Sequence, residues 1–276
     1  MASEYIISSL QKEKIEEYLA SGKRLDGRGP ADYRDIEVEM NISKNAESSV
    51  RVKFGKTEVI AGVKMAVVAP YPDSPAAGTF MTTVELHPMA SQQFEIGRPG
   101  IKSVELSRVV DRGIRESGFI DFEKLCIKEG EKVWQIFLDI FAINDDGNMM
   151  DVAGLAGIIA LGNAKMPEYD EKEDKLTGVL SKESLPIDKD ALSFNMTFHK
   201  ISGVIVADVS EEEEAISDYR LSIAVGDNNG EARITAMQKG KSGVISSEDM
   251  EKILKLVENK FKKMFPKIRK YVFING

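Results

Sequence analysis

The chain has very few of the residues that form disulfides and metal sites. Cys126 is the single cysteine among 276 residues, which excludes an internal disulfide and favours a reducing compartment. His87 and His199 are the two histidines, and neither a Cys-x-x-Cys nor a His-Glu-x-x-His spacing occurs. Because zinc sites need clustered nitrogen and sulfur ligands, we expect no metal site and no cofactor, and we interpret each histidine as a surface or strand residue.

Long apolar runs are also missing. The longest candidate, residues 152–161, is shorter than the roughly 20 residues that a membrane helix needs, and it contains glycines. Charged residues interrupt the first 17 positions, unlike the apolar centre of a signal peptide. The net charge of −8 argues against a surface that is basic throughout, but it is compatible with a local basic stripe. We therefore expect a soluble cytoplasmic protein without a membrane partner.

The spacing of apolar residues predicts an α+β fold. Helical spacing is present in residues 6–19, 103–117 and 150–163, and again from Ser246, where Asp249 completes a start that resembles a capping box. Alternating or continuous apolar runs, which are typical of strands, lie at residues 50–54, 59–68, 80–86, 125–127, 133–143, 192–198, 204–206, 221–225 and 232–236.

The order of these elements indicates two halves, each with strands first and a long helix afterwards. We place the halves at residues 1–190, which include the leading helix, and 191–276, and we expect them to pack as one compact unit. Residues 167–190 are polar and mostly acidic, so a boundary or a long excursion is expected there. The four glutamates at residues 211–214 are expected at a solvated edge or loop, since adjacent carboxylates cannot face one point.

One constellation of charged residues stands out. Arg108, Arg112 and Arg115 are spaced i, i+4 and i+7 in the helix predicted near residues 103–117, so they share one face. In one interpretation this is a solvated face whose arginines pair with nearby carboxylates of the same helix. In the other it binds a polyanion backbone, because each guanidinium is a planar donor fork that fits a phosphate.

Several segments, in this order, resemble the RNase PH family, and specifically the non-catalytic ring subunits of archaeal exosomes. The resemblance covers nearly the whole chain and rests on Arg-Leu-Asp-Gly-Arg-Gly-Pro at 24–30 with Tyr-Arg at 33–34, on residues 105–112, on residues 133–139 and on the stretch from 147 through 151. It implies a duplicated βαβα fold of the RNase PH type, also described as ribosomal protein S5 domain 2-like. It implies a hexameric ring, a trimer of heterodimers with a catalytic paralogue, which carries RNA-binding cap proteins. The reaction of such a ring is 3′-5′ phosphorolysis of single-stranded RNA.

The departures from active members of the family are as informative as the matches. Active members carry an Arg pair, a Gly-Thr-Arg, a small hydroxyl-bearing phosphate loop and a catalytic Asp. The matching positions here read Ile-Lys-Ser at 101–103, Gly-Asn-Met at 147–149, Met-Thr-Phe-His at 196–199 and Arg220. The resemblance therefore implies a subunit without catalytic residues of its own.

What such a subunit retains is the row of three arginines at positions 108, 112 and 115. The resemblance implies that Arg108 and Arg112 contact the RNA backbone beside the active site of the paralogue, and helical geometry adds Arg115. The alternative is that the chain is itself a phosphate-dependent 3′-5′ exoribonuclease. Asp218, two residues before Arg220, or Asp208 would then be the catalytic carboxylate.

Overall fold

The computed structural model describes residues 7–228 and 230–274. The helices are α1 (Ser9–Ala20), α2 (Ile101–Arg115), α3 (Met149–Gly162), α4 (Glu211–Ile216) and α5 (Ser247–Val272). The strands are β1 (Ile36–Met40), β2 (Ser48–Phe54), β3 (Thr57–Val68), β4 (Thr79–Glu85), β5 (Cys126–Lys128), β6 (Lys132–Asn144), β7 (Lys165–Asp170), β8 (Lys175–Ser184), β9 (Ser193–Ile201), β10 (Val204–Ala207), β11 (Tyr219–Asn228) and β12 (Glu231–Gly240).

The first sheet has the strand order β1-β2-β3-β6-β4, with β5 on β6. Its pairs are antiparallel except for β4, which runs parallel to β6. Alternate residues of β3, such as Val59, Ala61 and Val63, are fully buried, as the period of two in a half-buried strand requires. One face of this sheet therefore forms part of the core.

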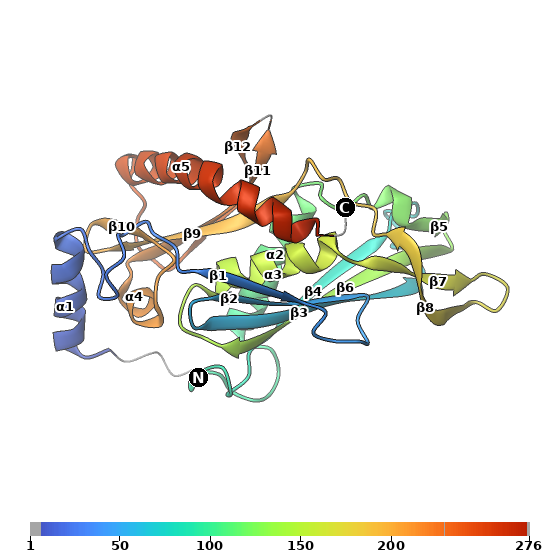
Figure 1. The fold of residues 1–276 in the computed structure, drawn as a ribbon, viewed down its shortest axis with the longest axis horizontal. Helices are drawn as coiled ribbons and strands as arrows, with labels where there is room; N and C mark the ends of the chain where they lie inside the picture. Colours follow the sequence, from blue (N-terminus) through green and yellow to red (C-terminus); the bar gives the residue numbers. More distant parts are fainter. Residues whose placement is uncertain (1–6, 229, 275–276) are drawn as a thin grey trace.

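The second sheet has the order β10-β9-β11-β12 and is antiparallel throughout. Helix α5 covers one of its faces, where the ring of Phe194 stacks on that of Phe261 with centroids 6.3 Å apart (Figure 1). The predicted start of this helix is confirmed, because Ser246 and Asp249 form a reciprocal capping box.

Helices α2 and α3 lie side by side between the two sheets (Figure 1). Helix α3 is buried on all sides from Met149 to Leu161, and its glycines permit this close packing. A Cβ at Gly154 would lie 2.7 Å from Nδ2 of Asn195, and one at Gly157 would lie 2.9 Å from Cδ2 of Leu138. A large connected core results, with members in both sheets, and a smaller separate cluster lies under α1.

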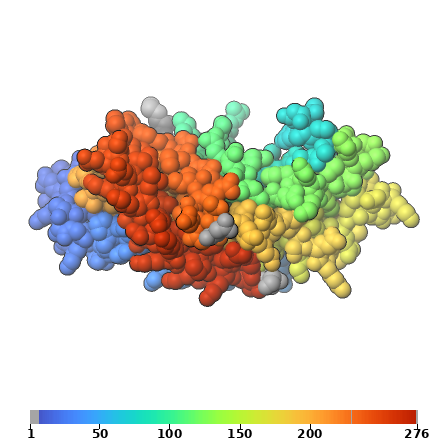
Figure 2. All heavy atoms as spheres, turned by 90° about the horizontal axis from the view of Figure 1, so that it is seen from above, coloured from blue at the N-terminus to red at the C-terminus, as the bar shows by residue number. Residues whose placement is uncertain are grey.

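The predicted α+β class is confirmed, and the long excursion expected at residues 167–190 is present, although its strands were not predicted. Most of this polar segment forms the hairpin of β7 and β8, which projects from one end of the molecule (Figures 1 and 2). The apolar residues of β8, Leu176, Val179 and Leu180, do not alternate with polar ones, because the hairpin stands largely in solvent and neither face is buried. The division at residue 190 stays a prediction. Helix α1, counted with the first half, packs through Ile15 and Leu19 on residues of the second.

In the part of the chain that the structure describes, no helix has the length and apolar character for crossing a membrane.

Candidate nucleic-acid interface

Helix α2 presents the predicted arginine face. Leu106, Val110 and Ile114 are buried against the core, whereas Arg108, Arg112 and Arg115 are exposed on the other side. The amphipathic pattern of the segment thus separates an apolar and a cationic face. The helix begins after Gly100 and ends at Arg115, two residues earlier at each end than the sequence predicted.

Arg115 is held by its own chain. Its Nε and one terminal nitrogen donate to the Asp111 carboxylate at 3.0 and 3.1 Å, and the same terminal nitrogen donates to the carbonyl of Phe80 at 3.0 Å. The guanidinium also lies 5.6 Å from the ring centroid of Phe80 and 5.5 Å from that of Phe122. For Arg115 this geometry favours the interpretation as a paired surface residue.

Arg108 and Arg112 are different, because neither forms an ion pair or a side-chain hydrogen bond with any residue in the described ranges. Two nearby carboxylates are engaged elsewhere, Asp111 with Arg115 and Glu105 with Arg220, and exposed Glu116 forms no ion pair with either arginine in the described ranges. Both arginines line a cavity of about 520 Å³ on one side and a hollow of about 300 Å³ on the other. The ridge between the two hollows therefore carries two available guanidiniums.

The segment that the resemblance pairs with the phosphate loop of active family members lies in the interior of a sheet here, with a strand on each side. Residues 196–199 belong to β9, which pairs with β10 on one side and β11 on the other. The amide of Thr197 donates to the Asp151 carboxylate at 3.0 Å, and its hydroxyl donates to Ser222 Oγ at 3.0 Å. Burial lowers the pKa of His199 well below its ordinary value, and its Nδ1 lies 2.9 Å from Ser217 Oγ. These donors are thus committed within the protein.

Arg220, at the position where the resemblance expects a catalytic Asp, is also engaged in an internal contact. Arg220 reaches across to Glu105 on α2 and forms an ion pair. Asp218 is exposed just before β11, and its backbone carbonyl accepts a hydrogen bond from the amide of Gly243 at 3.1 Å. The arrangement offers exposed cations for binding an anionic strand, whereas the buried carboxylate beside Thr197, that of Asp151, accepts its hydrogen bonds from within the chain.

Comparison with known proteins decides the family. Residues 32–167 match the first domain, and residues 195–258 the second domain, of the RNase PH family described as the 3′ exoribonuclease family. The chain belongs to the RNase PH family. Its fold class and its two-part architecture are those of this family.

Close relatives within the family are named as exosome components. The chain is 41% identical over 274 residues to the exosome complex component Rrp42 of Pyrococcus horikoshii, covering 99% of this chain and 97% of the relative. It is 43% identical over 272 residues to the protein of the same name from Methanothermobacter thermautotrophicus, covering 95% and 98%. A chain in the structure of the Archaeoglobus fulgidus exosome with RNA bound to the active site matches with a TM-score of 0.84 and 39% identity, covering 94% of this chain and 97% of that one.

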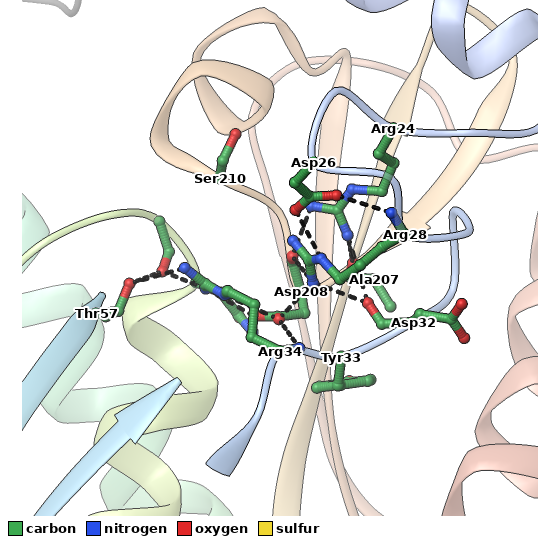
Figure 3. Close-up of polar contacts among 12 residues, drawn as sticks. Arg24, Asp26, Arg28, Asp32, Tyr33, Arg34, Thr57, Ala207, Asp208 and Ser210 are labelled. Atoms are coloured by element: carbon green, nitrogen blue, oxygen red, sulfur yellow. Dashed lines mark hydrogen bonds and ion pairs between the residues drawn. The ribbon is translucent and has the colours of Figure 1, made fainter. Parts of the chain in front are cut away.

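The opening motif at residues 24–34 builds a buried ionic cluster around Asp208 (Figure 3). Arg34 grips this carboxylate with Nε at 2.9 Å and a terminal nitrogen at 2.7 Å, and Arg28 adds a third contact at 2.8 Å. Burial alone would raise the pKa of Asp208, but the hydrogen bonds and charge of Arg34 lower it below its ordinary value. Asp208 is fully buried and fully occupied, so the geometry does not support it as a catalytic carboxylate.

The same cluster corrects the prediction for residues 211–214. These glutamates open the short helix α4, and Glu213 is buried rather than solvated. Its carboxylate pairs with Arg24, which is itself 1% exposed and also donates to the carbonyls of Ala207 and Asp208 at 3.0 and 2.8 Å. The Ser210 capping box turns Glu213 inward, and a partner 189 positions away stabilises it there. Sequence spacing carries no signal of such a distant pair.

Asp151 is a further buried carboxylate, and no role was predicted for it from the sequence. Its carboxylate accepts hydrogen bonds from the amide of Thr197 at 3.0 Å, Nδ2 of Asn148 at 3.1 Å and the hydroxyl of Tyr33 at 3.4 Å. Burial raises its pKa to about 7, and the nearby charge of Asp208 acts in the same direction. The contacts tie α3 to the second sheet and to the opening motif.

Proposed function

We propose that this chain is a ring subunit of an archaeal exosome that holds single-stranded RNA for a catalytic paralogue and does not cleave RNA itself. The observation that carries the proposal is the contrast on α2 and β9. Two exposed arginines have no internal partner in the described ranges, whereas the positions that match the phosphate site are closed by hydrogen bonds. The names of its close relatives, which are exosome components, support this role.

Arginines suit the binding step because their guanidiniums pair with phosphates whatever the base sequence. Such backbone contacts position a strand without reading it, and they weaken as salt concentration rises. A degrading complex has to accept every sequence, so this mode of binding fits the task. Holding the strand across a subunit boundary would assist the paralogue through orientation alone.

The absence of catalysis in the proposal follows from chemistry. Phosphorolysis needs inorganic phosphate held beside the 3′-terminal linkage and a group that assists proton transfer to the leaving oxygen. The matching positions in this chain hold Arg220 in an ion pair and Thr197 in internal hydrogen bonds. In the proposed assembly this chain alternates with the paralogue in a trimer of heterodimers that carries RNA-binding cap proteins.

The test is reconstitution. The chain alone, the paralogue alone and the two together are incubated with RNA and inorganic phosphate, and nucleoside diphosphate release is measured. We expect release only when the paralogue is present, and faster release when both are. The double variant Arg108→Ala/Arg112→Ala should assemble normally but bind RNA more weakly with a lower salt dependence.

A control away from α2 is Arg269→Ala, which removes a half-buried guanidinium of α5 that pairs with Asp190. This variant should bind RNA as the unaltered complex does. Robust nucleoside diphosphate release by the chain alone would support the alternative, an exoribonuclease using Asp218 or Asp208. Unchanged RNA affinity in the double variant would show that the α2 face is only a solvated surface.

A further inference from the structure

The larger hollow beside the two arginines is a half-open pocket. It lies between α2 and the second sheet and has a volume of about 520 Å³, within the range of small-molecule sites. Val104 and Val109 form part of its α2 wall, and Ala224 and Ala236 part of the opposite wall. Two facing walls of small apolar side chains leave a slot suited to a flat apolar group.

The floor of the cavity carries an amide without an internal partner. Asn195 on β9 is only 7% exposed, yet its side chain forms no hydrogen bond with any residue that the structure describes. Its amide atoms are not among the side-chain atoms fully enclosed without a partner, so the amide is open to a group that enters the cavity and hydrogen-bonds to it. Asn195 pairs in register with Ala224, and Ala224 with Ala236, so one row of side chains leads from this amide to the edge strand.

The mouth of the cavity is positively charged. Arg108 and Arg112 line it, and the one acidic residue of the lining, Glu105, is already paired with Arg220. Val104 and Met237, also in the lining, are 46% and 39% exposed, so apolar surface continues to the entrance. An entering ligand therefore meets cations first, then apolar walls, and last an amide with one donor and one acceptor group.

We infer that this cavity receives one nucleobase of the bound RNA, turned out of the strand. The inference rests on the proposed function, because the phosphate beside that base would lie on Arg108 and Arg112. Single-stranded RNA is commonly recognised by bases that leave the stack and enter pockets with hydrogen-bond partners for their edges. The amide of Asn195 presents a donor and an acceptor, and every base edge offers a complement to one or both, so the pocket accepts all four bases.

The experiment uses the complex with the paralogue and two fluorescent oligoribonucleotides of equal length. One is unmodified, and the other has abasic residues over the segment that contacts this subunit, so it keeps its phosphates. We expect the unaltered complex to bind the unmodified strand roughly tenfold more tightly. Ala236→Leu, which fills the slot, should abolish most of that difference, whereas Ala232→Leu on the same strand but outside the lining should preserve it.

A second measurement requires no variant. Photo-crosslinking of a 4-thiouridine strand to the unaltered complex should give adducts on β12, at or next to Met237. Adducts found only on the paralogue would overturn the inference, as would an unchanged preference for the unmodified strand in Ala236→Leu. Failure of Ala236→Leu to join the ring, while it remains folded, would mean that a side chain of the paralogue fills the cavity, and that too would overturn it.

The arginine double variant separates the two proposals. If Arg108→Ala/Arg112→Ala binds RNA as the unaltered complex does, the proposed function fails. If the double variant binds weakly but filling the cavity changes nothing, the backbone role stands and the base pocket alone is wrong.

Discussion

Two groups of arginines in this chain have the same side-chain chemistry but different surroundings: one group is paired within the chain, and the other is exposed. Around Asp208, the guanidiniums of Arg24, Arg28 and Arg34 are directed at carboxylates and carbonyls of the chain itself (Figure 3). On α2, Arg108 and Arg112 are exposed and form no such pair among the described residues. Since a guanidinium always carries its charge, what differs is the supply of acceptors. An arginine surrounded by its own acceptors stabilises the fold, and one without them is available to an external anion.

The largest effect is expected when the buried group loses its central acceptor. Asp208→Ala leaves two guanidiniums without their carboxylate, and breaking a buried pair in this way costs about 3–5 kcal/mol. Urea unfolding of the purified chain measures this loss. Asp218→Ala, an exposed control, should change the free energy of unfolding by less than about 0.5 kcal/mol. An Asp208→Ala chain of normal stability that abolishes RNA degradation would instead identify Asp208 as a reacting group.

The second prediction concerns the pH dependence of the same buried region. Asp151 has a pKa of about 7 in the folded chain against an ordinary value of 3.8, so the folded state binds a proton that the unfolded state has released between these values. Its contribution to stability is therefore complete below about pH 4 and is lost as pH rises to about 7. Between pH 5 and 7 the chain should lose roughly 2 kcal/mol through this group.

Asp151→Asn removes this titration while retaining a side-chain oxygen for the amide of Thr197. Thermal or urea unfolding at several pH values should give a flatter dependence for the variant, and the two curves should converge toward acidic pH. Equal slopes for both proteins from pH 5 to 8 would contradict the assignment of the raised pKa to Asp151. Asp145, whose pKa burial raises to about 6, remains in both proteins and cancels in the comparison.

The third prediction concerns Arg112, whose removal should change RNA binding and leave stability unchanged. Arg112→Ala should leave the free energy of unfolding within about 0.5 kcal/mol of the unaltered chain, because no internal contact of the described residues is lost. In the assembled complex it should weaken RNA binding by roughly tenfold and lower the slope of log affinity against log salt by about 0.7. Fluorescence anisotropy at several salt concentrations measures both. A loss of stability without any change in the salt slope would place Arg112 with the buried group.

Much of this contrast could be predicted from the sequence, and the reason is local. The spacing of Arg108, Arg112 and Arg115 determines a shared helical face, and the apolar residues between them determine which face is buried. By contrast, the pairing of Arg24 with Glu213 joins positions 189 residues apart, so only the folded chain brings them together. The strands of the β7–β8 hairpin were missed because β8 is exposed along almost its whole length, and burial of one face is what produces a readable alternation.

Arg115 combines features of both groups of arginines, and its substitution should have the smallest of the predicted effects. It shares the exposed face of Arg112 yet has a carboxylate and two aromatic rings as partners. We expect Arg115→Ala to cost about 0.5–1 kcal/mol of stability and to leave the salt slope of RNA binding unchanged. Arg115→Lys keeps the charge but not the planar fork, so it should recover only part of that stability. If Arg115→Ala instead lowers the salt slope as much as Arg112→Ala does, internal acceptors do not decide which arginines reach the RNA, and position on the helix face alone does.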